Sequence, residues 1–175
     1  MNQVEIRNGF LLGQKNLRAL WLAVLVGLLL AGPAGAYAEQ PRAPKFWISN
    51  MEGQRFDSRE FEGKTIISFF YVNCAPCIEE IPELHKLVSK QYPKAALLFI
   101  DPVEDDTPQA ITEFAKRLNV PLKYFYHDSI GKIGKKFYNG NMYFPTIFGI
   151  SEGKVMFKIT KLDEESKEKI HEVLK

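Results

Sequence analysis

The spacing of apolar residues changes several times along the chain, and each change predicts an element of secondary structure. Continuous apolar, β-branched and aromatic runs have the character of buried strands, at 65–72, 95–100, 122–126, 146–150 and 155–159. Between them, apolar residues recur every three or four positions, which predicts amphipathic helices at 75–91, 108–118, 130–137 and 164–174.

Polar residues indicate where these elements turn and begin. The segments Phe46–Ser49 and Gln54–Asp57 flank a turn-forming stretch and predict a hairpin ahead of the first buried strand. A second turn at 151–154 joins the last two strands into another hairpin. The expected capping residues are Ser58, for a short turn through Phe61, and Thr107, Ser129 and Asp163, for the three later helices.

The resulting order, β-β-β-α-β-α-β-α-β-β-α, predicts an α/β fold with parallel crossovers and a terminal antiparallel hairpin. Ligand chemistry in such sheets belongs at the carboxyl ends of the strands. Cys74 lies at that end of the run 65–72, directly before the first helix.

The first 38 residues have a different character and predict export. Positive residues precede an almost wholly apolar stretch, 19–31, and Ala36-Tyr37-Ala38 has the form of a signal-peptide cleavage site. An uncleaved membrane anchor is the alternative, because the uncharged run 19–38 is about long enough to span a bilayer. Both readings place the domain outside the cytoplasm. The domain covers residues 46–175 and follows a polar linker at 39–45.

Charge excludes one class of partner. Of the 23 Lys and Arg residues three precede residue 39, as does one of the 21 Asp and Glu residues, so residues 39–175 carry no net charge. No basic stripe appears, and we expect no nucleic-acid partner.

The two cysteines of the chain, Cys74 and Cys77, lie where a buried strand becomes a helix. The first turn of a helix has unpaired N–H groups and a positive dipole end, which favour a thiolate. Cysteines three residues apart on a helix share a face and can form a disulfide. This arrangement predicts reversible dithiol–disulfide exchange.

Three other uses of the pair are weaker. A purely structural disulfide would close a short loop and gain little. A closed zinc site needs four ligands, and there is no second Cys pair. Covalent haem attachment needs a His after the second Cys, where Ile78 stands.

Several features together resemble the thioredoxin fold, and more narrowly the exported TlpA/ResA/CcmG-like thiol–disulfide oxidoreductases. Residues 74–82 match the family pattern Cys-x-x-Cys-x-x-Glu-x-Pro, and Phe144-Pro145-Thr146 precedes a terminal hairpin and helix. The N-terminal hairpin, the Gly63-Lys64 entry to the strand and a central β-α insertion at 95–126 also correspond. The resemblance implies a mixed central sheet flanked by helices.

The resemblance also implies how the site works. Cys74 is expected to be the exposed nucleophile and Cys77 the shielded, resolving thiol. Pro76 before the second Cys resembles the reducing members, whose best-known substrate is apocytochrome c. A disulfide oxidase or isomerase of the same fold is the alternative. We expect protein substrates, a membrane electron donor for a reductase, no cofactor or metal, and a monomer.

Glu80 has two readings. It lies three residues past Cys77 on the same helix face and can take a proton from that thiol if burial raises its pKa. It can also merely complement the helix N-terminus. The family pattern favours proton transfer, because thioredoxin's strand Asp is replaced here by Ser68.

Substrate contacts are expected at Pro76, Tyr71, Phe144 and Pro145. The resemblance implies a cis peptide bond before Pro145, which would leave the Phe144 backbone free to pair with a substrate strand. A simple strand-start proline is the alternative. The family usually has Trp shortly before the first Cys; here Tyr71 is the aromatic residue available.

Single residues argue for or against two further classes of protein, copper chaperones and peroxidases. His127 near a strand end invites a copper-binding reading, but soft-metal proteins of that kind use Cys-x-x-x-Cys spacing. Peroxidatic sites place Thr three residues before the Cys, where this chain has Tyr71. Neither a copper chaperone nor a peroxidase is therefore favoured.

Overall fold

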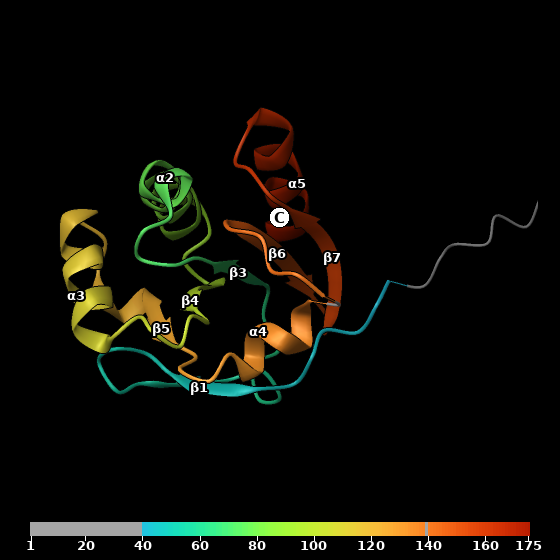
Figure 1. Ribbon diagram of the computed structural model, residues 1–175. Helices are drawn as coiled ribbons and strands as arrows, with labels where there is room; N and C mark the ends of the chain where they lie inside the picture. The colour runs from blue at the N-terminus through green and yellow to red at the C-terminus, as the bar shows by residue number, and fades with distance from the viewer. Residues whose placement is uncertain (1–39, 139) are drawn as a thin grey trace, which may run out of the picture. The chain divides into compact units, whose positions relative to one another are not determined.

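A computed structural model describes residues 40–138 and 140–175. Five strands form one sheet in the order β5-β4-β3-β6-β7, and β1 and β2 form a separate two-stranded sheet (Figure 1). The strands are β1 (Trp47–Ser49), β2 (Arg55–Asp57), β3 (Thr65–Phe69), β4 (Ala96–Asp101), β5 (Phe125–His127), β6 (Thr146–Ser151) and β7 (Lys154–Ile159). The helices are α2 (Ala75–Gln91), α3 (Pro108–Arg117), α4 (Lys132–Phe137) and α5 (Glu164–Leu174), with a 3₁₀ turn η1 (Leu122–Tyr124).

The sheet is mixed. β3, β4 and β5 run parallel, whereas β6 is antiparallel to β3 and β7 is antiparallel to β6. β3 is buried along its whole length, as its continuous apolar sequence predicts for the central strand. The α/β fold with a mixed sheet, an N-terminal hairpin and a β-α insertion is therefore confirmed.

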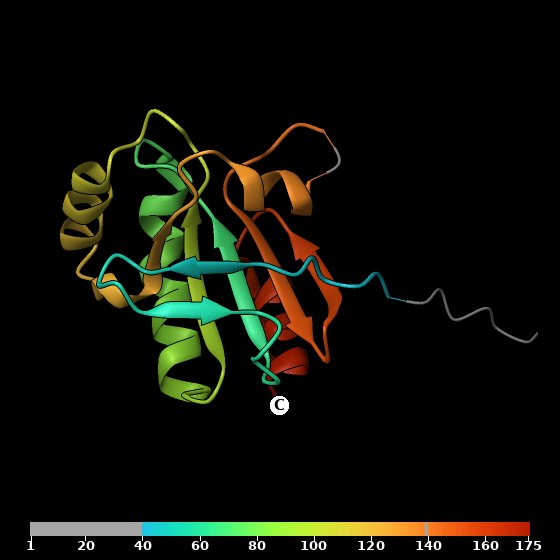
Figure 2. The same cartoon turned by 90° about the horizontal axis from the view of Figure 1, so that it is seen from below.

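Alternating residues of the strands enter two cores, one on each face of the sheet. Ile66, Phe99 and Phe125 pack with the buried faces of α2, α3 and α5. Ile67 and Leu98 point to the other face and pack with residues of β1 and α4. Figure 2 shows the β1–β2 hairpin crossing the strands of the main sheet on this second face.

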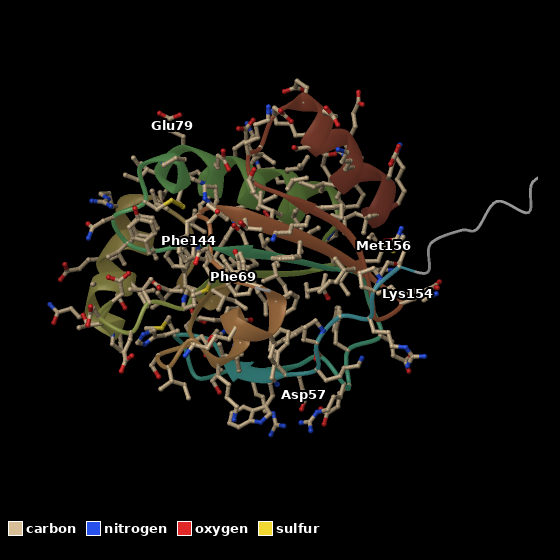
Figure 3. The ribbon with its side chains drawn as sticks, turned by 45° about the vertical axis from the view of Figure 1, so that its right-hand side comes forward. Asp57, Phe69, Glu79, Phe144, Lys154 and Met156 are labelled. Carbon is tan, nitrogen blue, oxygen red and sulfur yellow. A yellow bond between two sulfur atoms is a disulfide. The ribbon has the colours of Figure 1, made fainter. Side chains whose placement is uncertain are left out.

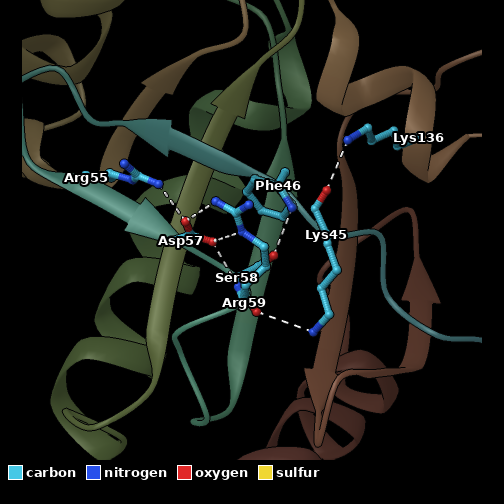
Figure 4. A network of polar contacts seen from close by, with 7 residues as sticks. All are labelled: Lys45, Phe46, Arg55, Asp57, Ser58, Arg59 and Lys136. Carbon is cyan, nitrogen blue, oxygen red and sulfur yellow. Dashed lines mark hydrogen bonds and ion pairs between the residues drawn. The ribbon is translucent and has the colours of Figure 1, made fainter.

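The hairpin is fastened by a charged network around Asp57, which is buried at the end of β2 (Figure 4). Arg55 and Arg59 both donate to its carboxylate, and the Arg59 guanidinium holds the pKa of Asp57 well below its usual range. The expectation that Ser58 caps the turn is wrong. The Asp57 carbonyl accepts the turn hydrogen bonds, while the Ser58 hydroxyl accepts the Phe46 N–H.

Two strands are shorter than expected. In the run 65–72, β3 ends at Phe69. The Phe70 N–H still donates to the Ile100 carbonyl of β4, whereas the Val72 N–H donates to the Asp106 carboxylate instead of a neighbouring strand. The run 122–126 begins as the 3₁₀ turn after Pro121, whose carbonyl accepts the Tyr124 N–H. β5 consequently covers 125–127.

Helix starts follow local capping rules with one exception. The side chains of Thr107 and Asp163 cap α3 and α5 as expected. The expectation that Ser129 caps α4 is wrong: the N-cap residue is Gly131, in the left-handed region at φ 60°. The Asp128 carboxylate accepts the N–H groups of residues 132, 133 and 134, so it takes the capping role.

The start of the described chain is joined to the terminal hairpin. The Ala43 N–H donates to the Gly153 carbonyl, and the Val155 N–H donates to the Pro41 carbonyl. The segment 1–38, expected to be a signal peptide or an anchor, lies outside the described residues. Among the residues described, from 40 onward, no helix is long and apolar enough to cross a bilayer.

Candidate active site

Cys74 and Cys77 form a disulfide at the start of α2, beyond the carboxyl end of β3. Their Cα atoms are 5.2 Å apart. Cys74 is the N-cap residue, with extended backbone, and Cys77 is in the first helical turn. The expected strand–disulfide–helix arrangement is therefore present.

The local electrostatics favour negative charge on the first sulfur. The Cys77 N–H points at Cys74 Sγ, 3.3 Å away, as it would at the oxygen of an ordinary capping residue. No acidic residue stands in the first turn of α2 to oppose this charge. Once the disulfide is reduced, the helix terminus and this N–H stabilise a Cys74 thiolate over the thiol.

Both cysteines are fully buried, each with an exposed fraction of 0 %. This was expected for Cys77, but the expectation of an exposed Cys74 is wrong for the disulfide form. The cysteines belong to the core on the α2 face, and the half-buried side chains of Tyr71, Val72 and Phe144 pack against that core. Exchange with a protein substrate therefore requires movement of the residues around the disulfide.

The expected substrate-contact residues fall in two places. Pro76 is exposed in the first turn of α2. Tyr71 and Phe144 meet edge to face, with ring centroids 5.4 Å apart, so the loop before β6 lies beside the loop before α2. The Phe144–Pro145 peptide bond is cis, as the resemblance implies, and Pro145 is buried directly before β6.

Glu80 lies half-buried on α2, beneath the connection between β7 and α5. Burial raises the pKa of its carboxyl above the ordinary value, and Glu83 and Asp163 add to this, while the Leu162 backbone acts against it. Its Oε2 atom is buried with no hydrogen-bond partner in the described chain. Glu79, by contrast, projects from the exposed side of α2 (Figure 3).

Sequence reasoning missed the residues that hold the loop before Cys74. The Val72 N–H donates to Asp106 Oδ2 at 3.1 Å, and Arg117 Nη2 donates to the Val72 carbonyl at 3.4 Å. Asp106 precedes α3 and Arg117 ends it, so both are more than 30 residues away in sequence. No local motif signals such contacts; only the position of Asp106 at the carboxyl edge of the sheet hints at them.

His127 does not complete a metal site with the cysteines. Among the described residues there is no group of three or more His, Cys, Asp or Glu side chains placed to hold a metal ion. His127 instead lines a cavity of about 580 Å³ between β1 and α4, with Trp47 and Lys132, and neither cysteine lines that cavity.

Comparison with known proteins agrees with this architecture. The model of the AhpC/TSA family matches residues 40–158. The thiol-disulfide oxidoreductase ResA of a Bacillus cereus strain is 29% identical over 170 residues, covering 89% of this chain and 95% of that protein. ResA of Bacillus thuringiensis subsp. konkukian has the same identity and coverage.

Solved structures have the same fold. A putative protein disulfide isomerase from Bacteroides thetaiotaomicron superposes with a TM-score of 0.65 at 23% identity, covering 77% of this chain and 89% of that one. StoA from Bacillus subtilis superposes with a TM-score of 0.62 at 22% identity, covering 73% and 97%. With the family model spanning the sheet and the disulfide, the chain belongs to the AhpC/TSA family and has a thioredoxin-like fold.

Proposed function

We propose that this thiol–disulfide oxidoreductase works outside the cytoplasm as a reductase of disulfides in partner proteins. The observation that carries the exchange chemistry is the position of Cys74, at a helix N-terminus with the Cys77 N–H directed at its sulfur. That position stabilises the reduced, thiolate-bearing form, and a more stable reduced form would by itself make the couple more oxidising. The reducing direction rests instead on Pro76 and on the likeness to ResA.

The reaction proceeds by two exchanges. The Cys74 thiolate attacks a substrate disulfide, forming a mixed disulfide and releasing one substrate thiolate. The Cys77 thiolate then attacks Cys74 Sγ, releasing the second substrate thiolate and closing the Cys74–Cys77 disulfide. Both electrons come from the two cysteines, so no cofactor is needed.

We also propose a proton acceptor for Cys77, a substrate-contact surface and an electron donor. Glu80 takes the proton from Cys77 as this thiol becomes a nucleophile. Tyr71, Pro76, Phe144 and Pro145 contact the substrate, for which the Cys-x-x-Cys-His segment of apocytochrome c is the first candidate. The segment 1–38 directs the protein to the outer side of the membrane, where a membrane donor reduces the disulfide again, and the protein acts as a monomer.

The redox potential of the Cys74–Cys77 couple tests the direction of electron flow. We expect a value nearer to that of thioredoxin, about −270 mV, than to that of the oxidase DsbA, about −120 mV. The two differ by about 7 kcal/mol for two electrons, which equilibration with glutathione buffers resolves easily. A potential above about −180 mV would show that the protein is an oxidase or isomerase instead.

A further inference from the structure

Two carboxyl groups lie behind the loop that precedes Cys74. Asp101 ends β4, at the same edge of the sheet where β3 ends, and its exposed fraction is 0 %. Its Oδ1 accepts the Val103 N–H at 2.9 Å. Its Oδ2 is buried and has no hydrogen-bond partner among the described residues. The carboxyl group of Asp106 is close enough to raise the pKa of Asp101.

A proton on Asp101 would give this unpartnered oxygen a hydrogen-bond partner, because a protonated carboxyl group can donate. Burial raises the pKa of Asp101 to about 8, and the charge of Asp106 adds to the effect. A protonated Asp101 can donate to Asp106, which turns two facing acceptors into a hydrogen bond. At neutral pH Asp101 therefore carries a proton that it can donate to Asp106.

Among the described residues, no cation lowers the pKa of Asp101 and so removes this proton. His127 is the register partner of Asp101 on β5, but the two side chains form no ion pair. Arg117 of α3 bonds to Val72. β3 has no ionisable side chain, and the half-buried ionisable residues of α2 lie elsewhere, Glu80 under Leu162 and His85 against Tyr124.

Asp106 connects this acid pair to the active site. Its Oδ2 accepts the N–H of Val72, whose carbonyl is held by Arg117, and the Cys74 N–H donates to the carbonyl of Tyr71 at 3.1 Å. The peptide groups leading to the nucleophile are thus fixed from the α3 side. Because both cysteines have no exposed surface, an attacking thiolate reaches a sulfur atom only when the surrounding residues move.

We propose that Asp101 and Asp106 are positioning residues for disulfide exchange: Asp106, partnered by Asp101, holds Val72 and keeps the loop 71–73 closed over the disulfide. The role concerns access to the sulfur atoms, so it is independent of whether the protein is a reductase or an oxidase. It also makes access depend on the proton that Asp101 carries.

The first test removes the acceptor of Val72. The oxidised full-length protein and its Asp106→Ala variant are mixed with excess dithiothreitol, which becomes the cyclic disulfide while the protein disulfide becomes two thiols. Acid-quenched samples are alkylated and counted by mass spectrometry. We expect Asp106→Ala to be reduced at least threefold faster, and Asp105→Ala, one exposed residue away, at the wild-type rate. An unchanged or slower rate for Asp106→Ala overturns the proposal.

The second test measures how the reduction rate depends on the proton of Asp101. Asp101→Asn keeps a hydrogen-bond donor at every pH, whereas wild-type Asp101 ionises as the pH passes about 8 and then repels Asp106. The ratio of the wild-type to the Asp101→Asn reduction rate should therefore rise between pH 7 and 9, and the reagent's own pH dependence cancels in this ratio. In the Asp106→Ala background the same ratio should be flat. A flat ratio in both backgrounds overturns the role of the Asp101 proton.

Stability gives a readout that involves no thiol chemistry. A group whose pKa is raised by folding contributes stability at low pH that is lost as the pH rises towards the folded pKa. The melting temperature of the oxidised wild type should fall relative to Asp101→Asn between pH 5 and 8, and a parallel course of the two curves would contradict a protonated Asp101. The Asp106→Ala rate is informative even if Asp101→Asn does not fold.

Discussion

Cys74 combines two roles at the residue scale, as the capping residue of α2 and as the expected nucleophile. A capping side chain must lie close to the N–H groups of the first turn, and this closeness stabilises negative charge on sulfur. The same position places Cys74 inside the core on the α2 face, where it is fully buried. The reactivity of this sulfur therefore depends on its neighbours as well as on the helix.

Glu80 is the residue whose role is most open to a direct test. Glu80→Gln keeps the size of the side chain and removes its titration. If Glu80 accepts the proton of Cys77, exchange with a protein disulfide should slow by about tenfold or more. The wild-type rate should rise as the pH passes the raised pKa of Glu80, because only the carboxylate accepts a proton, and this step should be absent from the variant's pH profile.

Glu79→Gln is the matched control for this measurement, because Glu79 is exposed one position away on α2. It should behave as wild type throughout. Equal rates for the two variants between pH 5 and 9 would assign Glu80 a purely electrostatic role at the helix start.

Some residues of the site can be placed from the sequence pattern of one segment, and others only from contacts between distant segments. Cys74, Cys77 and Glu80 share one helix, so their spacing alone places them together. The roles of Asp101 and Asp106 arise from contacts between β4, the start of α3 and the loop after β3, which no local pattern encodes. The burial of Cys74 has no local signal either, because the core to which it belongs includes residues of distant segments.

At the scale of elements, a capping residue can be predicted only when it directly precedes its helix. Thr107 and Asp163 satisfy this condition and were found. Asp128 acts across three residues and a left-handed Gly131, so the nearer Ser129 was chosen wrongly. β5 was predicted too early because the apolar character of 122–124 does not distinguish a 3₁₀ turn from a strand.

Asp128 and Ser129 form a natural pair for testing this assignment. Asp128→Ala removes the acceptor of three N–H groups and should lower the free energy of unfolding by about 1–2 kcal/mol, the usual cost of losing a helix cap. Ser129→Ala, at an exposed position, should change it by less than about 0.5 kcal/mol. Urea unfolding of the oxidised protein measures both, and equal losses would return the capping role to Ser129.

At the scale of the whole molecule, the order of elements predicted the parallel crossovers and the terminal hairpin, but not that β6 pairs antiparallel with β3. β3, β4 and β5 alternate with α2 and α3 and become parallel neighbours, and the short turn 151–154 makes the last pair antiparallel. β6 follows α4 but does not lie beside β5. The position of the β1–β2 hairpin across the second face was not predictable, because it depends on Phe46 and Ile48 meeting the far side of β3 and β4. The topology nevertheless places the disulfide at the carboxyl edge of the parallel strands.

The redox state of the whole protein in the cells that produce it distinguishes a reductase from an oxidase. Outside the cytoplasm an unprotected dithiol becomes a disulfide, so a reductase is maintained only if a donor keeps supplying electrons. We expect most Cys74–Cys77 pairs to be reduced at steady state. Acid quenching of whole cells followed by maleimide alkylation measures this fraction, with diamide-treated cells as the fully oxidised reference. Digestion by protease added to spheroplasts would place the protein outside the membrane. If the protein lies there and most of its Cys74–Cys77 pairs are oxidised, it is an oxidase.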